Sequence, residues 1–367
     1  MALQCATLTV RNHESNTALP PFDMTSEHTK KTDLPENITL EMVARTAGVS
    51  PATVSRILNG SARVSDKKRA AVAAVIKQLN YRPNALARGL AQGRTNSIGV
   101  LTQDIASPFY GEALRGIEDA LKDTGAIPLI VSGHWILRDE VERLEHLLSR
   151  RVDGLIVLTG SLPDDELIRY AGEVPLVVTG RDLEADNLTS LRFDDYAGAR
   201  IATEHLIDLG HRRIAHVAGP LDHFDSLERL RGYREALIDA GIAFDDDLVV
   251  HADFHEPGGL LAINQLIAAR TPFTAVFAAN DQSAFGARLA LHTHGIRVPE
   301  DISIVGFDDL PVSNYVVPPL TTVKQPAYEM GEIAARALVS MIHGEPKLGQ
   351  LPRPELVVRA SSRPLRR

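Results

Sequence analysis

The stretch that most constrains this fold lies between residues 38 and 58, where two short helices are joined by a tight turn. The first helix has one apolar stripe at helical spacing, formed by Leu40, Val43, Ala44 and Ala47. Gly48 follows this stripe, at the point where helices commonly end in a left-handed residue. Ser50 and Pro51 then provide an N-cap and a first helical residue, so a second helix is predicted to begin there.

This second helix, Pro51 to Leu58, has a polar outer side. It is predicted to bury Val54, Ile57 and Leu58 and to expose Ala52, Thr53, Ser55 and Arg56. Two short helices with a tight turn and a polar second helix are typical of a helix-turn-helix, whose second helix lies in the DNA major groove. Small helical hairpins also occur in proteins without a DNA partner, so the pattern alone leaves that alternative open.

The distribution of charge favours the DNA-binding alternative. Residues 38–98 contain ten Lys or Arg and two Asp or Glu, whereas the whole chain has a formal net charge of −8. An acidic chain with one basic segment has a localised surface for a polyanion.

A third helix is predicted from Ser65, as its N-cap, to Asn80. Its buried stripe consists of Val72, Val75, Ile76 and Leu79. Pro83 ends the helical pattern, and Asn84 is placed to cap a further helix over 85–91. That segment is too short to be a stable helix alone in water.

These residues resemble a known family. GVSPATVSRILNG, followed by VSDKKRAAVAAVIKQLNYRPNALARGL, is similar to the DNA-binding headpiece of LacI/GalR transcription regulators. The resemblance implies a helix-turn-helix domain over 37–83 and a hinge helix with linker over 84–96, which folds when two copies pair over DNA. Leu90 then matches the leucine that enters the minor groove as an apolar wedge. The positions assigned to DNA contact are Thr39, Leu40, Ser50, Pro51, Ala52, Thr53, Ser55, Arg56, Asn59, Arg63, Tyr81, Asn84, Ala87 and Leu90.

From Ser97 onward the sequence period changes, and apolar runs of strand length alternate with amphipathic helices. The predicted strands are 98–101, 127–131, 154–158, 176–178, 214–217, 248–251, 275–278 and 302–305. The predicted helices are 110–124, 137–149, 165–171, 195–209, 227–240, 257–269, 281–293 and 327–343. This alternation indicates parallel sheets with helices on both faces, and it is long enough for two of them. Ligands of such sheets bind beyond the carboxyl ends of the strands.

Four motifs after these strands, GHRRIAHVAGP, FAANDQ, GFDD and PPLTTVKQP, look like core signatures of the same family. The resemblance implies an N-terminal all-α headpiece followed by an α/β core like a type I periplasmic binding protein, over residues 97–359. Two doubly wound parallel-sheet lobes, with crossovers near 193 and 323, would hold an effector between them.

The resemblance also assigns effector-binding residues. Arg229 and Asp308 match the family's most regular ligand contacts, and Phe254 matches an aromatic that stacks on the ligand. Asn280 matches a polar contact, and Phe109 and Tyr110 match an apolar wall. His223 and Asp225, which precede Arg229 in the sequence, are candidate specificity residues. Carboxylates and a guanidinium pair well with adjacent hydroxyls, and an aromatic face suits the C–H face of a pyranose or a flat base.

Each central residue has an alternative interpretation. Arg229 could pair with Glu228 or Asp225 on the surface, where an ion pair contributes little. Asp308 could cap a loop, and Phe254 could belong to the core. The single tryptophan, Trp135, either lines the cleft or fills space.

Several classes of function lack their sequence signals. There is no Walker loop, no GxGxxG after a strand and no GxSxG elbow, so neither an enzyme nor a bound cofactor is expected. No His pair has metal-ligand spacing, and His205 and His211 are interpreted as structural. The single cysteine, Cys5, suits a reducing compartment. No apolar run reaches the length of a membrane span, and the N-terminus lacks a basic leader, so a cytoplasmic, nucleoid-associated protein is expected.

The predicted function is therefore a repressor that binds double-stranded operator DNA as a homodimer under the control of a sugar-like effector. Residues 1–36 are expected to be a disordered tail and 360–367 a solvated one, and the absence of a C-terminal leucine heptad favours a dimer over a tetramer. The alternatives are a regulator that responds to a purine or other metabolite, a solute-binding receptor without a DNA role, and a nucleotide-cofactor enzyme on a Rossmann-like sheet.

Overall fold

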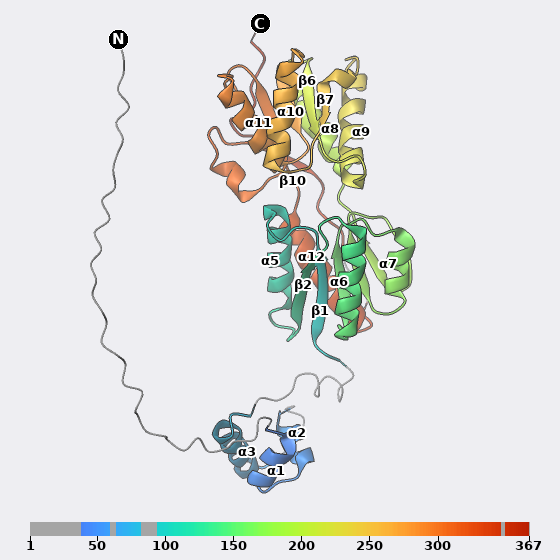
Figure 1. Cartoon of the computed structure of the whole chain (residues 1–367), viewed down its shortest axis with the longest axis vertical. Helices are drawn as coiled ribbons and strands as arrows, with labels where there is room; N and C mark the ends of the chain where they lie inside the picture. Colours follow the sequence, from blue (N-terminus) through green and yellow to red (C-terminus); the bar gives the residue numbers. More distant parts are fainter. Residues whose placement is uncertain (1–37, 59–63, 82–93, 346–348, 367) are drawn as a thin grey trace, which may run out of the picture. The chain divides into compact units, whose positions relative to one another are not determined.

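The structure, a computed structural model, describes residues 38–58, 64–81, 94–345 and 349–366 (Figure 1). The chain divides into a headpiece unit, 1–84, and a core unit, 85–367, and each is described by itself. The predicted tail over 1–36 and the predicted hinge helix lie outside the described residues.

Three helices form the headpiece unit, namely α1 (Leu40–Thr46), α2 (Pro51–Leu58) and α3 (Asp66–Gln78). Gly48 has a φ of +64° and ends the turn after α1, as the sequence predicted. Ser50 caps α2, because its Oγ accepts a hydrogen bond from the backbone N–H of Thr53 at 3.2 Å. Ser65 was expected to cap α3 in the same way, but its side chain makes no capping hydrogen bond.

The headpiece core is small. Its fully buried side chains are Val43, Ala44, Val54, Val72 and Val75. Ile57, Leu58, Ile76 and Leu79 were predicted to be buried with them; they pack against this cluster but remain half-buried. The apolar stripes therefore predicted which faces meet, although a unit of this size covers its peripheral side chains only in part.

The first lobe of the core, here the N-lobe, has a five-stranded parallel sheet in the order β2-β1-β3-β4-β5. Its strands are β1 (Ser97–Thr102), β2 (Ile127–Ser132), β3 (Gly154–Leu158), β4 (Leu176–Thr179) and β5 (Leu188–Leu191). Helices α5 (Pro108–Leu121) and α12 (Ala327–Ile342) pack on one face. On the other face lie α6 (Leu137–Ser149) and α7 (Asp164–Ala171), as Figure 1 shows.

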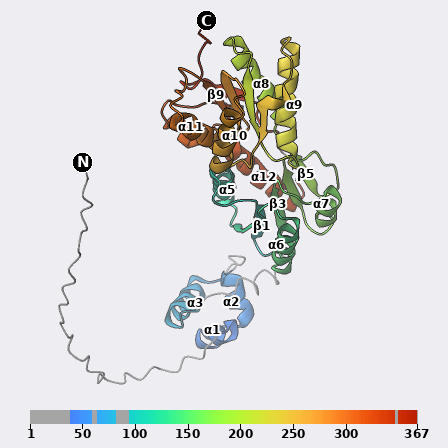
Figure 2. The ribbon, with the colours of Figure 1, turned by 45° about the horizontal axis from the view of Figure 1, so that its top comes forward.

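The second lobe, here the C-lobe, has a six-stranded sheet in the order β11-β10-β9-β8-β6-β7, in which only β11 is antiparallel to its neighbour. Its strands are β6 (Ile214–Ala218), β7 (Val249–His251), β8 (Ala275–Ala278), β9 (Ser303–Asp308), β10 (Thr321–Lys324) and β11 (Glu355–Val357). The helices α8 (Asp195–Asp208) and α9 (Phe224–Asp239) cover one face, and α10 (Glu256–Ala268) and α11 (Asp281–Thr293) cover the other (Figure 2). Two 3-10 turns, η1 (Asp246–Leu248) and η2 (Pro311–Asn314), complete it.

The chain passes between the two lobes three times. It leaves the N-lobe between β5 and α8, returns between β10 and α12, and crosses again between α12 and β11. Two of these crossovers lie near the predicted positions 193 and 323. The third was not predicted, because β11 is short and has no apolar run of strand length.

The C-terminal segment corrects one prediction. Residues 360–367 were expected to be a solvated tail, yet Ser361 is fully buried and its Oγ donates to the carbonyl of Ile304 at 2.7 Å. The backbone N–H of Leu365 donates to Leu209 O at 2.8 Å. His211, interpreted as structural, contacts the carbonyl of Arg363 at 3.1 Å through Nε2. The segment is thus anchored to the C-lobe by hydrogen bonds that no apolar pattern reveals.

Candidate functional site

Helix α2 presents the predicted DNA-contacting side chains in the headpiece unit. Pro51, Ala52 and Arg56 are exposed, whereas Thr53 and Ser55 are half-buried. Val54 is fully buried and anchors the helix from its opposite side. The outer face of α2 is therefore free to meet a ligand, as a recognition helix requires.

The remaining predicted DNA contacts divide into two groups. Thr39 and Ser50 are exposed N-terminal caps of α1 and α2, and Leu40 and Tyr81 are half-buried. Five further positions lie outside the described residues, namely Asn59, Arg63, Asn84, Ala87 and Leu90.

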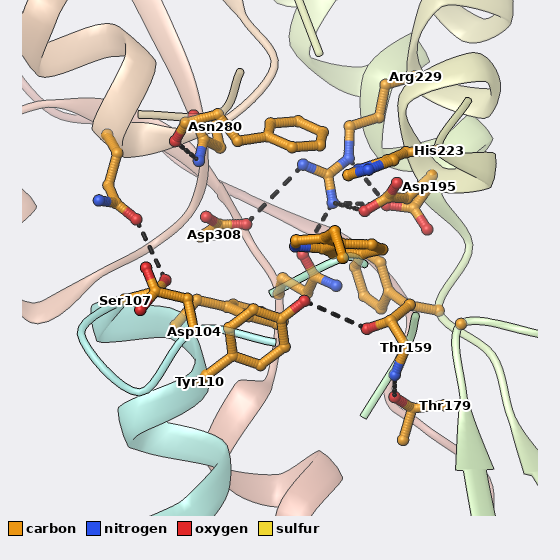
Figure 3. Close-up of a pocket in the computed structure, with 18 of the residues that line it drawn as sticks. Asp104, Ser107, Tyr110, Thr159, Thr179, Asp195, His223, Arg229, Asn280 and Asp308 are labelled. Carbon is orange, nitrogen blue, oxygen red and sulfur yellow. Dashed lines mark hydrogen bonds and ion pairs between the residues drawn. The ribbon is translucent and has the colours of Figure 1, made fainter. Parts of the chain in front are cut away.

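The second candidate site is a cavity between the lobes, with a volume of about 120 Å³ (Figure 3). Its walls come from the carboxyl ends of strands in both sheets and from the first turns of the helices that follow. All eight predicted effector residues line it, namely Phe109, Tyr110, His223, Asp225, Arg229, Phe254, Asn280 and Asp308. The other lining residues are Asp104, Ser107, Trp135, Thr159, Thr179, Gly180, Phe193, Asp195, Asp253, His255, Gln282, Gln325 and Met330.

Arg229 is the central cation of this cavity. Arg229 is only 3% exposed, so it does not form the surface ion pair that the sequence left open. Nε donates to Asp195 Oδ1 at 2.9 Å, Nη1 donates to the carbonyl of Ala279, and Nη2 donates to Gln325 Oε1 at 3.1 Å. The guanidinium also lies 3.9 Å from the centre of the Phe307 ring. These contacts fix its position before any ligand binds.

Three carboxylates surround this guanidinium. Asp225 and Asp308 lie 3.9 and 4.0 Å from it, beyond the hydrogen-bonded Asp195. Burial raises the pKa of Asp195 to about 7, against the pull of Arg229, and burial also raises the pKa of Asp308 well above its usual range. Burial alone would lower the pKa of Arg229, but the three carboxylates raise it. Arg229 therefore stays charged, while burial favours the protonated, neutral forms of Asp195 and Asp308.

Asp308 is held open toward the cavity. It is nearly buried, and among the described residues no hydrogen-bond donor reaches its carboxylate; its contact with Arg229 is a 4.0 Å ion pair. Its backbone has a φ of 114° and that of Asp309 a φ of 57°, conformations that non-glycine residues seldom adopt. Such strain is found where the surrounding structure fixes a functional side chain.

An aromatic wall comes from the C-lobe. Phe254, with a φ of 67°, is half-buried, and its ring packs where a side chain on Gly219 would collide. Asn280 holds this residue, because its Nδ2 donates to the carbonyl of Phe254 at 2.8 Å while its Oδ1 caps α11. Asn280 therefore fixes the position of Phe254. Phe254 lies in the cavity wall and is not part of the inner core.

The N-lobe supplies the opposite wall. Tyr110 at the start of α5 contacts Thr159, with 3.4 Å between their hydroxyl oxygens, and Phe109 packs edge-on against it. Thr159 in turn receives support from Thr179 Oγ1, which accepts its backbone N–H at 3.1 Å (Figure 3). Ser107 joins the lobes, because its Oγ donates to Gln282 Oε1 at 3.2 Å.

Comparisons with known proteins agree with this two-part arrangement. Residues 39–84 match "Bacterial regulatory proteins, lacI family", and residues 203–362 match "Periplasmic binding protein-like domain". The HTH-type transcriptional regulator GalR of Escherichia coli K12 is 38% identical over 309 residues, which cover 84% of this chain and 90% of that protein. The chain belongs to the LacI family.

Two solved LacI-family structures resemble the chain along 89% of its length and 100% of theirs. The lac repressor dimer bound to operator and the anti-inducer ONPF has a TM-score of 0.80 at 32% identity. A transcriptional regulator CelR–cellobiose complex has a TM-score of 0.65 at 38% identity. This LacI-family chain is thus a transcription regulator rather than an enzyme, with a headpiece joined to a core like a periplasmic binding protein.

Several lining residues of this LacI-family cleft were not predicted. Thr159 and Thr179 stand at the carboxyl ends of β3 and β4, a position that the sheet rule could have indicated. Asp195 is the first residue of α8, and the sequence predicted it as part of a helix but not of the site. Gln325 directly follows β10, a strand that was not predicted. Of the two interpretations of Trp135, the structure shows the lining one.

Among the described residues, no cluster of His, Cys, Asp or Glu has the geometry of a metal site. Within the same part of the chain, no helix has the length and apolarity of a membrane span.

Proposed function

We propose that this LacI-family protein is an operator-binding repressor that responds to a neutral saccharide held in the cleft between its lobes. The observation that carries this proposal is the ring of carboxylates around the buried Arg229, which faces the Phe254 ring in one cavity. Carboxylates and a guanidinium bind adjacent hydroxyls by charge-assisted hydrogen bonds, while the aromatic ring covers the C–H face of a sugar.

The charge of the cavity separates neutral ligands from anionic ones. Among the described residues that line the cavity, Arg229 is the single Arg or Lys. The same lining contains five aspartates, namely Asp104, Asp195, Asp225, Asp253 and Asp308. That cation is already bound to Asp195 and to a backbone carbonyl. A phosphorylated or acidic sugar would meet uncompensated negative charge, whereas a neutral polyol can donate hydroxyls to the open acceptors.

A similar protein with a sugar in its solved structure supports a saccharide as the ligand. The CelR structure holds cellobiose, and this chain is 38% identical to it. We therefore place neutral mono- and disaccharides ahead of purines and other metabolites, which remain the alternative within the family.

The DNA-binding part of the proposal rests on the exposed face of α2. Arg56 is exposed on this face, while Val54 on the opposite side of α2 is buried in the headpiece core. Residues 38–98 are also strongly basic within an acidic chain. The protein is proposed to act in the cytoplasm as a homodimer, so that two headpieces read a two-fold operator.

The dimer contact is proposed to lie on the C-lobe. Large apolar side chains are exposed on α10, α11 and the loop after η2, namely Leu261, Leu289, Tyr315 and Val317. These elements adjoin, because α10 packs on α11 and Arg288 of α11 donates to the carbonyl of Pro318 at 2.6 Å. Exposed apolar surface of this kind marks a protein contact.

Coupling follows from the cleft between the lobes. A ligand that bridges Arg229 and Asp308 of the C-lobe to Tyr110 of the N-lobe changes how the lobes are held and so alters the spacing of the two N-lobes in a dimer. The coupling is expected to be about 1–3 kcal/mol, or roughly 5- to 150-fold in operator affinity.

Binding of DNA from the gene's own upstream region tests the first half of the proposal. Fluorescence anisotropy should show specific binding whose logarithm falls linearly with log salt, because several phosphates are neutralised. Arg56→Ala should weaken it, whereas Arg69→Ala, an exposed arginine on α3, should keep the sequence preference. Equal affinity for unrelated DNA would overturn the repressor assignment.

Ligand specificity tests the second half. Melting temperature should rise with one of the neutral sugars galactose, ribose or cellobiose and not with galactose 6-phosphate. Asp308→Ala should weaken binding of the active sugar by roughly 10-fold, since the carboxyl that forms hydrogen bonds with its hydroxyls is lost. Stabilisation by hypoxanthine but by none of these sugars would replace the saccharide with a purine.

A further inference from the structure

One contact in the cavity wall joins the lobes through aromatic rings. The indole of Trp135 stacks on the imidazole of His223, with 3.9 Å between ring centroids and an angle of 23° between the planes. Trp135 lies between β2 and α6 of the N-lobe, and His223 is the residue before α9 of the C-lobe. We name this pair, Trp135 and His223, the aromatic clasp.

The N-lobe holds Trp135 in an unfavourable backbone conformation. His134 and Trp135 have φ values of 56° and 58°, two consecutive non-glycine residues in the left-handed region. Two side chains hold this turn: Gln103 Oε1 accepts the backbone N–H of Trp135 at 2.8 Å, and Ser161 Oγ donates to its carbonyl at 3.0 Å. Strain of this kind persists only where the surroundings over-determine it.

The support of this turn is itself buried. Gln103 and Glu140 are both fully buried, and Gln103 Nε2 donates to the carbonyl of Thr159 at 3.0 Å. Glu140 accepts the backbone N–H groups of Ser161 and Leu162 at 2.9 and 3.0 Å. The loops after β1, β2 and β3 are therefore tied together beneath Trp135, which fixes the indole at the lobe boundary.

The C-lobe partner of this indole is nearly buried. The side chain of His223 is 11% exposed, and its Nδ1 is buried without a hydrogen-bond partner among the described residues. A polar nitrogen without a partner is costly to bury, so separation of the rings would let water reach it. Trp135 is itself half-buried and packs against an N-lobe hydrophobic cluster, as Phe109 does.

We infer that the aromatic clasp holds the cleft closed together with the Ser107–Gln282 hydrogen bond: the cleft opens when His223 leaves Trp135, and the strength of the stack contributes to the rate at which a bound effector escapes. The inference rests on the proposed function only in taking the cavity as the effector site. Trp135 and His223 are then positioning residues. Loss of one aromatic pair should shift the equilibrium between closed and open cleft toward the open form by about 3- to 10-fold.

The chain carries a single tryptophan, so its fluorescence reports on Trp135 alone. In the full chain without ligand, His223→Ala should shift the emission to longer wavelength and raise the acrylamide quenching constant about 3-fold, since the indole loses its cover. His223→Phe, which keeps a ring, should restore the protection. His255→Ala is the matched control, because His255 lines the same cavity before α10 without stacking on Trp135. Unchanged emission and quenching in His223→Ala would overturn the clasp.

Effector release provides the second measurement. For whichever of galactose, ribose or cellobiose stabilises the wild-type protein, stopped-flow displacement should show about 3- to 10-fold faster release from His223→Ala and near wild-type release from His223→Phe. Identical release from His223→Ala and wild type would overturn the closure role. If no sugar binds, the saccharide proposal fails while the quenching result still decides whether the clasp exists.

Discussion

At the scale of single residues, Arg229 lies buried within a network of carboxyl groups. Its guanidinium forms ion pairs with Asp195, Asp225 and Asp308, and it donates a hydrogen bond to a backbone carbonyl of the C-lobe. Removing one partner of a buried charge network leaves the others uncompensated, which is far more damaging than the loss of a surface pair. An effect of Arg229→Ala on the effector response must therefore be separated from an effect on folding.

Arg229→Ala should lower the unfolding free energy of the core by about 3–5 kcal/mol, because buried carboxylates lose their cation. Arg231→Ala is the matched control on the same helix, since its pair with Glu228 is half-exposed and should change stability by no more than about 1 kcal/mol. Urea unfolding of both variants makes the comparison. Equal stability of the two would show that the network around Arg229 does not hold the C-lobe together.

Asp281 supports the loop that carries Asp308. This fully buried carboxylate accepts hydrogen bonds from the backbone N–H of Leu310 at 2.9 Å and from the hydroxyls of Ser313 and Thr322 at 2.6 Å each. Burial raises its pKa to about 7, although these three donors oppose the shift. The folded protein therefore binds a proton here that the unfolded chain releases above about pH 4.

This difference gives a sign for the pH dependence. The unfolding free energy should fall as pH rises from about 4 to about 7, by at most about 1.4 kcal/mol per pH unit from this group. Asp281→Asn, which imitates the protonated side chain, should flatten the slope, whereas Asp186→Asn in an exposed loop should not. Urea unfolding at pH 5 and pH 7 measures the slopes, and parallel profiles for wild type and Asp281→Asn would contradict the argument.

At the scale of elements, the helix pairs of the core approach through glycine. A side chain on Gly116 of α5 would stand 2.0 Å from the carbonyl oxygen of Tyr328 in α12, and one on Gly331 of α12 would stand 1.9 Å from that of Ala113. Gly259 and Gly286 bring α10 and α11 together in the same way. The absence of a side chain thus sets the distance between paired helices.

Gly116→Ala should destabilise the core by about 1–3 kcal/mol, since α5 must move away from α12. Gly111→Ala in the same helix meets no atom within 4 Å, so it should be neutral or stabilise by about 0.5–1 kcal/mol through the better helix propensity of alanine. Thermal or urea unfolding of the two variants decides. A stable Gly116→Ala variant would mean that the helices separate at little cost.

Elements that carry apolar runs were predicted from the sequence, and those that depend on polar pairing were not. The eight predicted strands all appear, because each carries apolar residues at strand length, although no residue of the edge strand β2 is buried. The missed strand β10 reads TTVK, and its Thr321 and Thr322 are buried through bonds to Ser361 and Asp281. Such long-range hydrogen bonds leave no period in the sequence, which is also why the anchored C-terminus was mistaken for a tail.

The candidate site divides in the same way. Asp308 could be placed because it lies in the GFDD motif after a predicted strand, and Arg229 and Phe254 because the family resemblance assigns their positions. Asp195 and Trp135 reach the cavity through a crossover and a strained turn, and no local pattern reports either. The partner of a side chain across the cleft is a property of the folded molecule, so the aromatic clasp could not be read from the sequence.

At the scale of the whole molecule, the proposed switch requires two copies. One headpiece binds a short half-site. When two headpieces are joined in a dimer, binding of the first raises the effective concentration of the second at the other half-site of a two-fold operator. The proposed dimer face on α10, α11 and the loop after η2 should therefore control operator affinity without touching DNA. Tyr315 and Val317, 82% and 88% exposed, are its most accessible apolar side chains.

Val317→Arg should convert the dimer to a monomer, because a two-fold contact would bring two like charges together at an apolar face. Ile168→Arg on α7 is the control, as it places the same charge at another exposed apolar position. Sedimentation should show half the mass for Val317→Arg alone, and its operator affinity should fall by at least about 100-fold as the second half-site contact becomes intermolecular. Since the side chain of Val317 is exposed and does not line the cavity, sugar binding should stay close to wild type. A Val317→Arg protein that remains dimeric would move the dimer contact to another face of the core.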